Sequence, residues 1–212
     1  MVGMPATRSE RKRDAIVEAA TEIFLRSGYR GTSMDDIAAA AGVSKQTVYS
    51  HFADKEALFL DIVVSTVDET GDPVRAGVVE VADSGDLAAD LVDLARRQLD
   101  QVLQPRLLQL RRLVISEAER FPTLGEVFLE RGQARTGAAL ADAFARLGER
   151  GLLVVDDPVQ AATHFNQLIL AGPVNRVMFL GLVGIPKRAE RDRIAEQGVR
   201  AFLAAYGPTT PR

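Results

Sequence analysis

Hydrophobic residues recur at helical spacing along most of the chain, and short polar or glycine-containing segments separate these stretches. Gly28 should end the first helix, because glycine enters conformations that are costly for other residues. The only strand-like run, at 152–155, is too short to form a stable sheet alone. The pattern therefore predicts an all-α protein, whose first helix buries the stripe Ile16, Ala19, Ala20, Ile23 and Phe24.

Start and turn signals follow one another closely after this first helix. Thr32 or Ser33 can cap a short helix, and an acidic residue three positions later can complete a capping box. Gly42 supplies a turn, and Ser44 can cap a second short helix that runs from Lys45 to His51. A further helix should begin after Asp54. The one face of the helix before the turn comprises Met34, Ile37, Ala38 and Ala41.

The helix after the turn carries hydrogen-bond donors where a core helix would carry leucines. An ordinary helical hairpin is the alternative, but a merely solvated face would mix in Asp and Glu, and this helix has neither. Only Val48 and Phe52, four residues apart, look like core anchors. Gln can pair with adenine, Lys can reach guanine, a Thr methyl can touch thymine, and hydroxyls suit phosphates. We therefore predict a DNA-binding helix-turn-helix over about residues 32–51.

The run from Gly42 to Phe59, with the first helix before it, resembles the signature of the TetR family of transcriptional regulators over residues 9–65. The resemblance implies that Gln46, which replaces a small residue often found there, helps to set base preference. For His51 we expect a solvated or phosphate-facing imidazole with no switching role. The resemblance implies two sets of DNA contacts. Thr32 or Ser33 and Lys55 would contact flanking phosphates. The residues that would contact DNA from the second helix are Ser44, Lys45, Gln46, Thr47, Tyr49 and His51.

The same resemblance implies the organisation of the chain. An N-terminal three-helix DNA-binding domain precedes a C-terminal helical bundle for ligand binding and dimerisation. The expected boundaries are a disordered basic tail at 1–8, the DNA-binding domain at 9–69, the regulatory and dimerisation domain at 70–206, and a tail at 207–212.

Charge limits the kind of DNA binding. The net charge is −3, and the first sixty residues hold eight basic and eight acidic side chains, which argues against a protein that coats DNA indiscriminately. A basic cluster stands at the N-terminus and can be either a solvated charge run or a clamp on phosphates or the minor groove. Its members are Arg8, Arg11, Lys12 and Arg13.

Several other classes of protein find no support. Without cysteine there is no disulfide or thiolate chemistry, and two distant histidines do not suggest a metal site. We find no phosphate loop, no His-Glu-x-x-His and no Gly-x-Ser-x-Gly, so we expect neither an enzyme nor a cofactor. No hydrophobic leader precedes the first helix, and we expect no apolar run long enough to span a membrane. The sequence predicts a cytoplasmic protein.

Further helices are expected after Lys55, and Gly71-Asp72-Pro73 should break or kink the first of them. The last two differ in kind, because 168–174 is apolar without interruption and must be covered on every side. A second copy could cover one side through a four-helix interface; a monomer core is the alternative. The helices expected after the one that begins at Lys55 span residues 87–103, 106–120, 122–150, 158–182 and 187–206, and Pro173 should kink the helix at 158–182. The expected interface residues are Phe165, Leu168, Ile169, Ile194, Gly198, Ala201, Phe202 and Ala205.

Residues 110–122 resemble the regulatory domain of an AefR-like subgroup, so a ligand pocket is expected in the bundle. Such pockets are apolar with a few convergent polar groups. Glu117 could instead pair with Arg112 or Arg120, and Asn166 could face a partner. The candidate polar groups are Ser116, Glu117, His164, Asn166, Gln167, Asn175 and Arg176.

Together these features predict a homodimeric repressor. A small apolar or amphipathic ligand would enter the bundle, displace the helix near Leu58 to Val67, and release a palindromic operator. The alternatives are a ligand-dependent activator and a DNA-binding co-regulator whose C-terminal region only dimerises or docks a partner protein.

Overall fold

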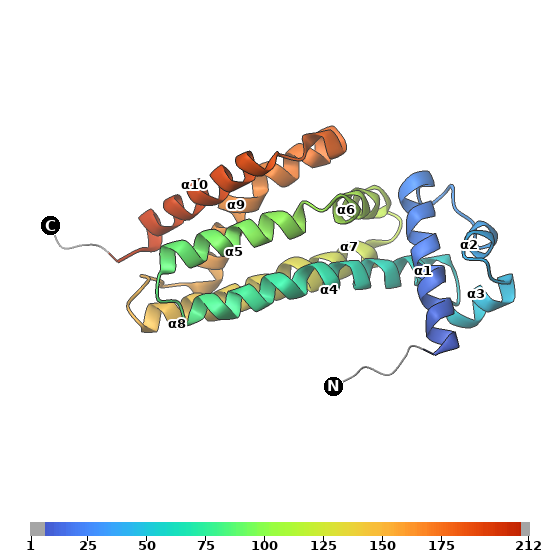
Figure 1. The fold of residues 1–212 in the computed structure, drawn as a ribbon, viewed down its shortest axis with the longest axis horizontal. Helices are drawn as coiled ribbons and strands as arrows, with labels where there is room; N and C mark the ends of the chain where they lie inside the picture. The colour runs from blue at the N-terminus through green and yellow to red at the C-terminus, as the bar shows by residue number, and fades with distance from the viewer. Residues whose placement is uncertain (1–6, 209–212) are drawn as a thin grey trace.

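The computed structural model describes residues 7–208, and every regular element in that range is a helix. The first three helices cluster at one end of an elongated molecule, and the remaining helices form a long bundle (Figure 1). The all-α prediction is confirmed. The elements are α1 (Arg8–Ser27), α2 (Met34–Ala40), α3 (Lys45–His51), α4 (Lys55–Ala82), α5 (Leu87–Val102), α6 (Pro105–Glu117), α7 (Pro122–Phe128), the π-helical η1 (Leu129–Ala134), α8 (Arg135–Glu149), α9 (Pro158–Leu180), the 3₁₀ turn η2 (Gly181–Gly184) and α10 (Arg188–Tyr206).

Local capping fixes both ends of α1. Thr7 is the N-cap and forms a capping box with Glu10, so the helix starts inside the segment expected to be a tail. Gly28 ends α1 with a positive φ of 73°, as the sequence predicts. The rest of the two expected tails, 1–6 and 209–212, lies outside the described residues.

The expected break at Gly71-Asp72-Pro73 is wrong, because α4 continues through it as one helix. An internal proline costs roughly 3 kcal/mol. Burial of Val74, Val78 and Val81 in the bundle outweighs this cost, since each buried valine contributes about 1.5 kcal/mol or more. Tertiary packing therefore overrides the local signal.

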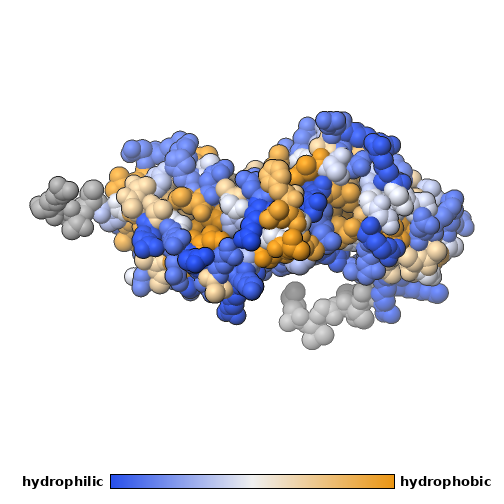
Figure 2. Space-filling model, turned by 90° about the horizontal axis from the view of Figure 1, so that it is seen from above, coloured by the Kyte–Doolittle hydropathy of each residue, from blue (hydrophilic) through white to orange (hydrophobic). Residues whose placement is uncertain are grey.

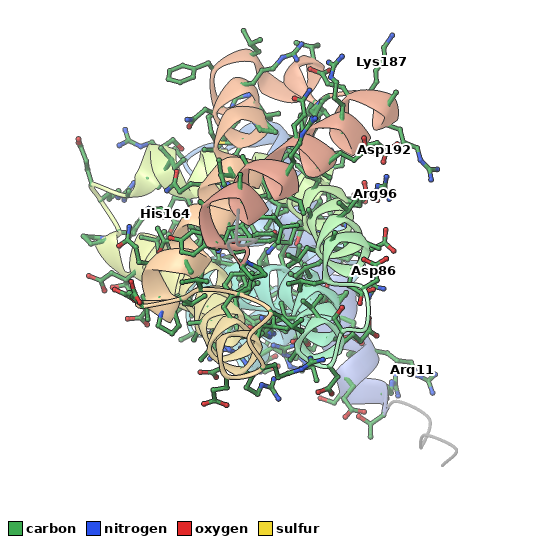
Figure 3. All side chains as sticks on the ribbon, turned by 90° about the vertical axis from the view of Figure 1, so that its left-hand side faces the viewer. Arg11, Asp86, Arg96, His164, Lys187 and Asp192 are labelled. Atoms are coloured by element: carbon green, nitrogen blue, oxygen red, sulfur yellow. The ribbon has the colours of Figure 1, made fainter. Side chains whose placement is uncertain are left out.

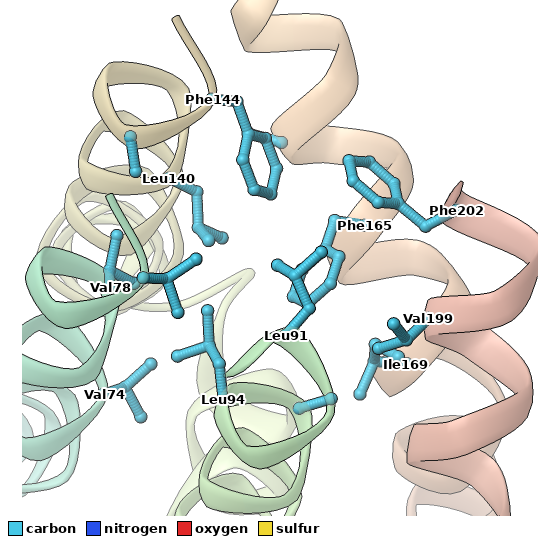
Figure 4. Close-up of a cluster of buried hydrophobic side chains, with 14 of the residues drawn as sticks. Val74, Val78, Leu91, Leu94, Leu140, Phe144, Phe165, Ile169, Val199 and Phe202 are labelled. Atoms are coloured by element: carbon cyan, nitrogen blue, oxygen red, sulfur yellow. The ribbon is translucent and has the colours of Figure 1, made fainter. Parts of the chain in front are cut away.

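Two hydrophobic clusters fill the molecule, and α4 contributes to both of them. The first lies under α1, α2 and α3 and stacks Phe24, Tyr29 and Phe59, with Phe121 edge-on to Tyr29. The second fills the bundle around three phenylalanines of α8, α9 and α10 (Figure 4). Residues of α6 and α7 belong to the first cluster, so these helices join the bundle to α1, α2 and α3.

Figure 4 also corrects part of the expected dimer interface. Phe165, Ile169 and Phe202 are completely buried in the chain's own core, where Phe165 and Phe202 pack edge to face. Gly198 is buried as well, and a Cβ there would lie 2.4 Å from Cδ1 of Ile169. Its small size serves close packing of α10 on α9 within one chain.

The single helix expected over 122–150 contains a π-helical turn, η1, between α7 and α8. The strand-like residues 152–155, which follow α8, form a loop rather than a strand. The amide of Val154 donates to the carbonyl of Tyr206 at 2.7 Å, which ties this loop to the end of α10. Ion pairs fix α10 on the other side, where Arg96 of α5 reaches Asp192 and Glu196 (Figure 3).

The helix pair α9 and η2 corrects a second expectation. Residues Pro158–Gly184 are long and apolar enough to cross a membrane by length and composition, although such a run was not expected. Length and composition alone are weak evidence for a span, and the helix carries Asn166, Asn175 and Arg176. Several of its large apolar side chains are exposed on the surface of the molecule, among them Leu168, Phe179 and Leu180.

Candidate nucleic-acid interface and ligand cavity

The turn between α2 and α3 is built by local hydrogen bonds. Ser33, rather than Thr32, is the N-cap of α2, and its box partner is Asp36. Hydrogen bonds from the side chain and the backbone of Ser33 lower the pKa of Asp36. Gly42 has a φ of 64°, and the next amide, of Val43, closes the corner on the carbonyl of Ala38 at 3.1 Å.

Helix α3 lies at the end of the molecule that is remote from the C-terminal bundle (Figure 1). Ser44 caps it by accepting a hydrogen bond from the Thr47 amide at 3.1 Å. Val48 is fully buried and Phe52 is 6% exposed, so both expected anchors hold the inner face. Lys45, Gln46, Tyr49 and Ser50 are exposed, and Thr47 and His51 are half-buried.

Some of these donors already have partners within the chain. The ammonium of Lys45 lies 2.8 Å from a carboxylate oxygen of Asp35, and this hydrogen-bonded pairing raises the pKa of Lys45. The hydroxyls of Ser44 and Thr47 are 2.9 Å apart. Tyr49 is 46% exposed, and Gln46 is also exposed on this face. A DNA base or phosphate must therefore compete with Asp35 for Lys45.

Thr32 and Lys55, which were expected to contact flanking DNA phosphates, form hydrogen bonds within the chain instead. The Thr32 hydroxyl is buried and donates to the Gly28 carbonyl at 2.8 Å. The Lys55 ammonium donates to the carbonyls of Tyr29 and Thr32, both at 2.8 Å, and lies 4.2 Å from the Tyr29 ring centre. Burial lowers the pKa of Lys55. In this conformation both side chains hold the α1–α2 connection together.

The N-terminal basic cluster lies on the first turns of α1. Arg13 forms an ion pair with Asp61 of α4, and its guanidinium lies 5.5 Å from the ring centre of Phe52. One member of the cluster therefore fixes α1 on α4. Contact of the others with phosphates stays a prediction. We call α1, α2 and α3, together with the first part of α4 that packs beneath them (residues 55–67), the head.

Two short helices, α2 and α3, joined by the tight turn at Gly42 and exposing donors on α3, form a helix-turn-helix, the arrangement that DNA-binding proteins use to lay the second helix in the major groove. Comparison with known families narrows this class. The family model described as bacterial regulatory proteins, tetR family, matches residues 16–62, and that of the AefR-like transcriptional repressor, C-terminal domain, matches residues 89–208. The chain belongs to the TetR family of DNA-binding transcriptional regulators.

Solved structures agree along nearly the whole chain. A TetR-family regulator from Mesorhizobium loti is 42% identical with a TM-score of 0.89, over 95% of this chain and 100% of that one. The Flavonoid-responsive Regulator FrrA is 33% identical with a TM-score of 0.71, over 94% of this chain and 99% of that one. These similarities confirm the fold of head and bundle together.

Curated relatives match over shorter stretches. The transcriptional activator FasR of Mycolicibacterium smegmatis is 38% identical over 77 residues, which is 36% of this chain and 35% of FasR. The repressor DhaR of Mycobacterium sp. (strain GP1) is 31% identical over 116 residues, which is 46% of this chain and 59% of DhaR. The matches thus span less than two thirds of these relatives, and their names include both directions of regulation.

A cavity of about 430 Å³ lies in the bundle, between α4, α5, α6, α9 and the η1 region. Three of the expected polar residues, Asn166, Gln167 and Asn175, line it. Ser116, Glu117, His164 and Arg176 do not, and the reason differs for each.

Ser116 is exposed and donates to the carbonyl of Leu113 at 2.8 Å. Glu117 is buried at the junction with the head, where its charge acts on Tyr29 and Lys55. His164 lies near the end of the bundle, with Nδ1 2.6 Å from the Tyr206 hydroxyl (Figure 3). Arg176 faces α10 and pairs with Glu190 at 3.1 Å. These four positions are corrections to the expected ligand site.

Sequence reasoning missed five other polar residues of the cavity wall, which are Thr70, Gln98, Arg111, Gln133 and Thr136. Gln98 of α5 is 1% exposed, and its amide nitrogen donates to Asn166 at 3.1 Å. Arg111 of α6 also lines the wall. Its position between Leu107 and Val114 on the apolar stripe of α6 was the available signal, because charged residues rarely occupy that stripe without a purpose.

A second hollow lies along the outer side of α9 and α10. Leu168, Gly172 and Arg176 line it from α9, and Ile194 and Ala201 line it from α10. Four exposed apolar side chains follow at the end of α9 and in η2, and Figure 2 shows hydrophobic residues gathered on one face of the molecule. They are Phe179 and Val183, each 87% exposed, Leu180 at 57% and Leu182 at 39%.

Proposed function

We propose that the protein is a homodimeric repressor that a small apolar or amphipathic ligand releases from a palindromic operator in the cytoplasm. The observation that carries this proposal is one chain with three separate features: an exposed donor helix, a cavity in the bundle, and exposed apolar side chains on α9 and η2. The AefR-like family description, which names a repressor, supports this direction of regulation.

For DNA binding, we assign the α3 face to the major groove. Gln46 and Tyr49 are exposed and can reach base edges, whereas the hydroxyls of Ser44 and Thr47 suit phosphates. In a dimer the two copies of α3 would lie about 34 Å apart, one turn of DNA. The operator would then have two-fold symmetry like the protein.

For dimerisation, we assign the exposed apolar side chains of α9 and η2 and the facing side of α10. Leu168 and Phe179 stand eleven residues, about three turns, apart and so share one side of α9. Val183 is exposed in η2, and Ala201 and Ala205 are exposed on α10. Exposed apolar side chains gathered in this way are typical of an interface. A two-fold axis would place the same patch of two copies against itself and form a four-helix contact.

This interface has a direct test. Leu168→Glu and Phe179→Glu should convert the dimer to a monomer in analytical ultracentrifugation, because each buries a charge in the contact. Val159→Glu is the matched control, since Val159 is 67% exposed at the start of α9, nine residues from Leu168 and hence on its opposite side. A dimer that survives both substitutions would contradict the assignment.

For ligand response, two helices connect the cavity to the head. Helix α4 contributes Val67 and Val74 to the cavity wall, and its first half lies in the core of the head. Helix α6 contributes Leu107, and the neighbouring Arg106 pairs with Glu18 of α1 at 3.0 Å. A ligand that shifts either helix would therefore move the head, as a population shift between two conformations.

The test of release requires the operator. DNA fragments selected from random sequence by the purified protein would supply it. Isothermal titration of a ligand, first identified by native mass spectrometry of protein from its host, should then show about fivefold or more weaker binding when operator is present. Equal ligand affinity in both states would refute ligand release.

An activator is the second candidate, because the relative FasR is named an activator. In this case the ligand would strengthen operator binding, and the same titration would show tighter ligand binding on DNA. A co-regulator that only dimerises or docks a protein would show no ligand effect at all.

A further inference from the structure

The polar lining of the bundle cavity is unbalanced in charge. Arg111 is the one charged residue among the described residues that line the cavity, and no carboxylate lies in its wall. The Nε atom of Arg111 is buried without a hydrogen-bond partner. Within residues 7–208 its guanidinium is otherwise placed 5.3 Å from the ring centre of Phe128, which also lines the cavity.

A covered guanidinium without a carboxylate is unfavourable unless something compensates its charge. Burial lowers the pKa of Arg111, yet an arginine stays protonated at neutral pH because its ordinary pKa lies above about 12. The cavity therefore carries a positive charge in the free protein. A ring face compensates such a charge only weakly.

A second polar group in the same wall has unused capacity. The Oε1 atom of Gln98 is buried without a partner, while the amide nitrogen of this residue is used by Asn166. Gln133, Gln167 and Asn175 add further amides to the wall. Groups that can recognise hydroxyl or amide substituents thus accompany the cation.

Most of the rest of the wall is apolar, although Thr70 and Thr136 also line it. The large apolar side chains are Val67, Val74, Val102, Leu107, Phe128, Leu170 and Val174. We propose that the cavity binds an amphipathic organic anion, whose acid group is held by Arg111 and whose apolar body lies on these side chains. The planar guanidinium fork suits a carboxylate with two parallel hydrogen bonds. This inference names the ligand class of the sensor site and so rests on the proposed function.

A pair of fluorescent probes tests the anion requirement without DNA. 1-Anilinonaphthalene-8-sulfonate carries an acid group, and N-phenyl-1-naphthylamine has the same aromatic body without it. The wild-type protein should bind the sulfonate more tightly than the neutral probe. Arg111→Gln should weaken sulfonate binding about tenfold to a hundredfold, the usual effect of losing a hydrogen bond to a charged group, and should change neutral-probe binding less than about twofold.

Three variants control this result. Arg112→Gln removes the neighbouring exposed arginine of α6 and should change neither affinity. Arg111→Lys keeps the charge and should retain part of the preference for the anion. Ala171→Phe places a large ring in the cavity and should weaken both probes, which locates them there rather than on the exposed apolar side chains of α9. Thermal melting of each variant checks that the fold is intact.

Competition against the bound sulfonate separates two sources of the anion. Dodecanoate against dodecanol tests an aliphatic acid, and 2-naphthoate against 2-naphthalenemethanol tests an aromatic acid. In at least one pair the acid should compete better than the alcohol in the wild type and lose this advantage in Arg111→Gln.

The proposal is overturned if Arg111→Gln weakens both probes equally, if Arg112→Gln has the same effect, or if the wild type binds no sulfonate. Failure of the proposed function has a different signature. If anion binding depends on Arg111 but leaves operator affinity unchanged, the anion site stands and ligand release fails.

Discussion

Replacement of Lys55 by methionine distinguishes two roles for this side chain. The family resemblance implies that Lys55 grips a DNA phosphate, whereas in the structure its ammonium donates to the carbonyls of Tyr29 and Thr32, both at 2.8 Å. Methionine keeps the apolar stem and removes the charge. We expect Lys55→Met to destabilise the head rather than to remove one DNA contact.

The size of the effect follows from these contacts. A hydrogen bond to a charged group contributes about 1.5–3 kcal/mol when buried, and the contact with the Tyr29 ring adds about 0.5–1 kcal/mol. Burial lowers the pKa of Lys55, so the ammonium loses hydration in the folded state, and water still reaches part of it. After discounting for both, we expect a loss of about 2 kcal/mol in the free energy of unfolding.

Urea unfolding at equal protomer concentration measures this loss, and Lys187→Met, at an exposed lysine before α10, is the control. Operator binding across a salt series measures the other role. A lost phosphate contact would lower the slope of log K against log salt by about 0.9 per contact. We expect an unchanged slope. A lower slope with an unchanged urea midpoint would refute the structural role and restore the phosphate contact.

Three further predictions concern the head and the bundle. Tyr49→Ala should weaken operator binding at least about tenfold in fluorescence anisotropy with an unchanged melting temperature, because Tyr49 is 46% exposed on the α3 face; unchanged affinity would remove it from the interface. Gly198→Ala should cost about 1–3 kcal/mol and lower the melting temperature, because the new methyl would lie 2.4 Å from Cδ1 of the fully buried Ile169 and 3.3 Å from the Leu168 carbonyl oxygen; an unchanged melting temperature would show that the Ile169 side chain can move aside. The carboxylate of Asp36, whose pKa is lowered by hydrogen bonds from Ser33, should stabilise the head above the ordinary carboxyl pKa, and this stability should be lost as pH falls through the lowered value. The difference in stability between wild type and Asp36→Asn should therefore vanish in acid, and a difference independent of pH would contradict this origin.

The head could be predicted closely because its determinants are local. Ser44 and Asp54 cap the helices that follow them, and Gly28 and Gly42 adopt the positive φ angles that the turns require. Such signals act within four residues, so the sequence contains them in readable order. The choice of Ser33 over Thr32 as the cap of α2 needed the structure.

The bundle could be predicted only in outline. An almost wholly apolar helix such as α9 does not show which side faces the core, and the interface prediction therefore mixed buried Phe165 and Ile169 with exposed Leu168. Pro73 lies inside α4 because packing on both sides outweighs its local cost. The importance of Arg111 depends on the absence of a carboxylate around it, and that is a property of distant segments brought together by the fold.

The shared ownership of α4 limits how this molecule can be dissected. The core beneath α3 is completed by residues that follow the loop between α3 and α4, the place where a DNA-binding fragment would ordinarily be ended. These residues are Leu58, Phe59, Ile62 and Val63. A fragment ending at Asp54 would lose all four and should fail to fold. Transplanting the DNA-reading unit onto another protein therefore requires the first half of α4, residues 55–67, to be included with it.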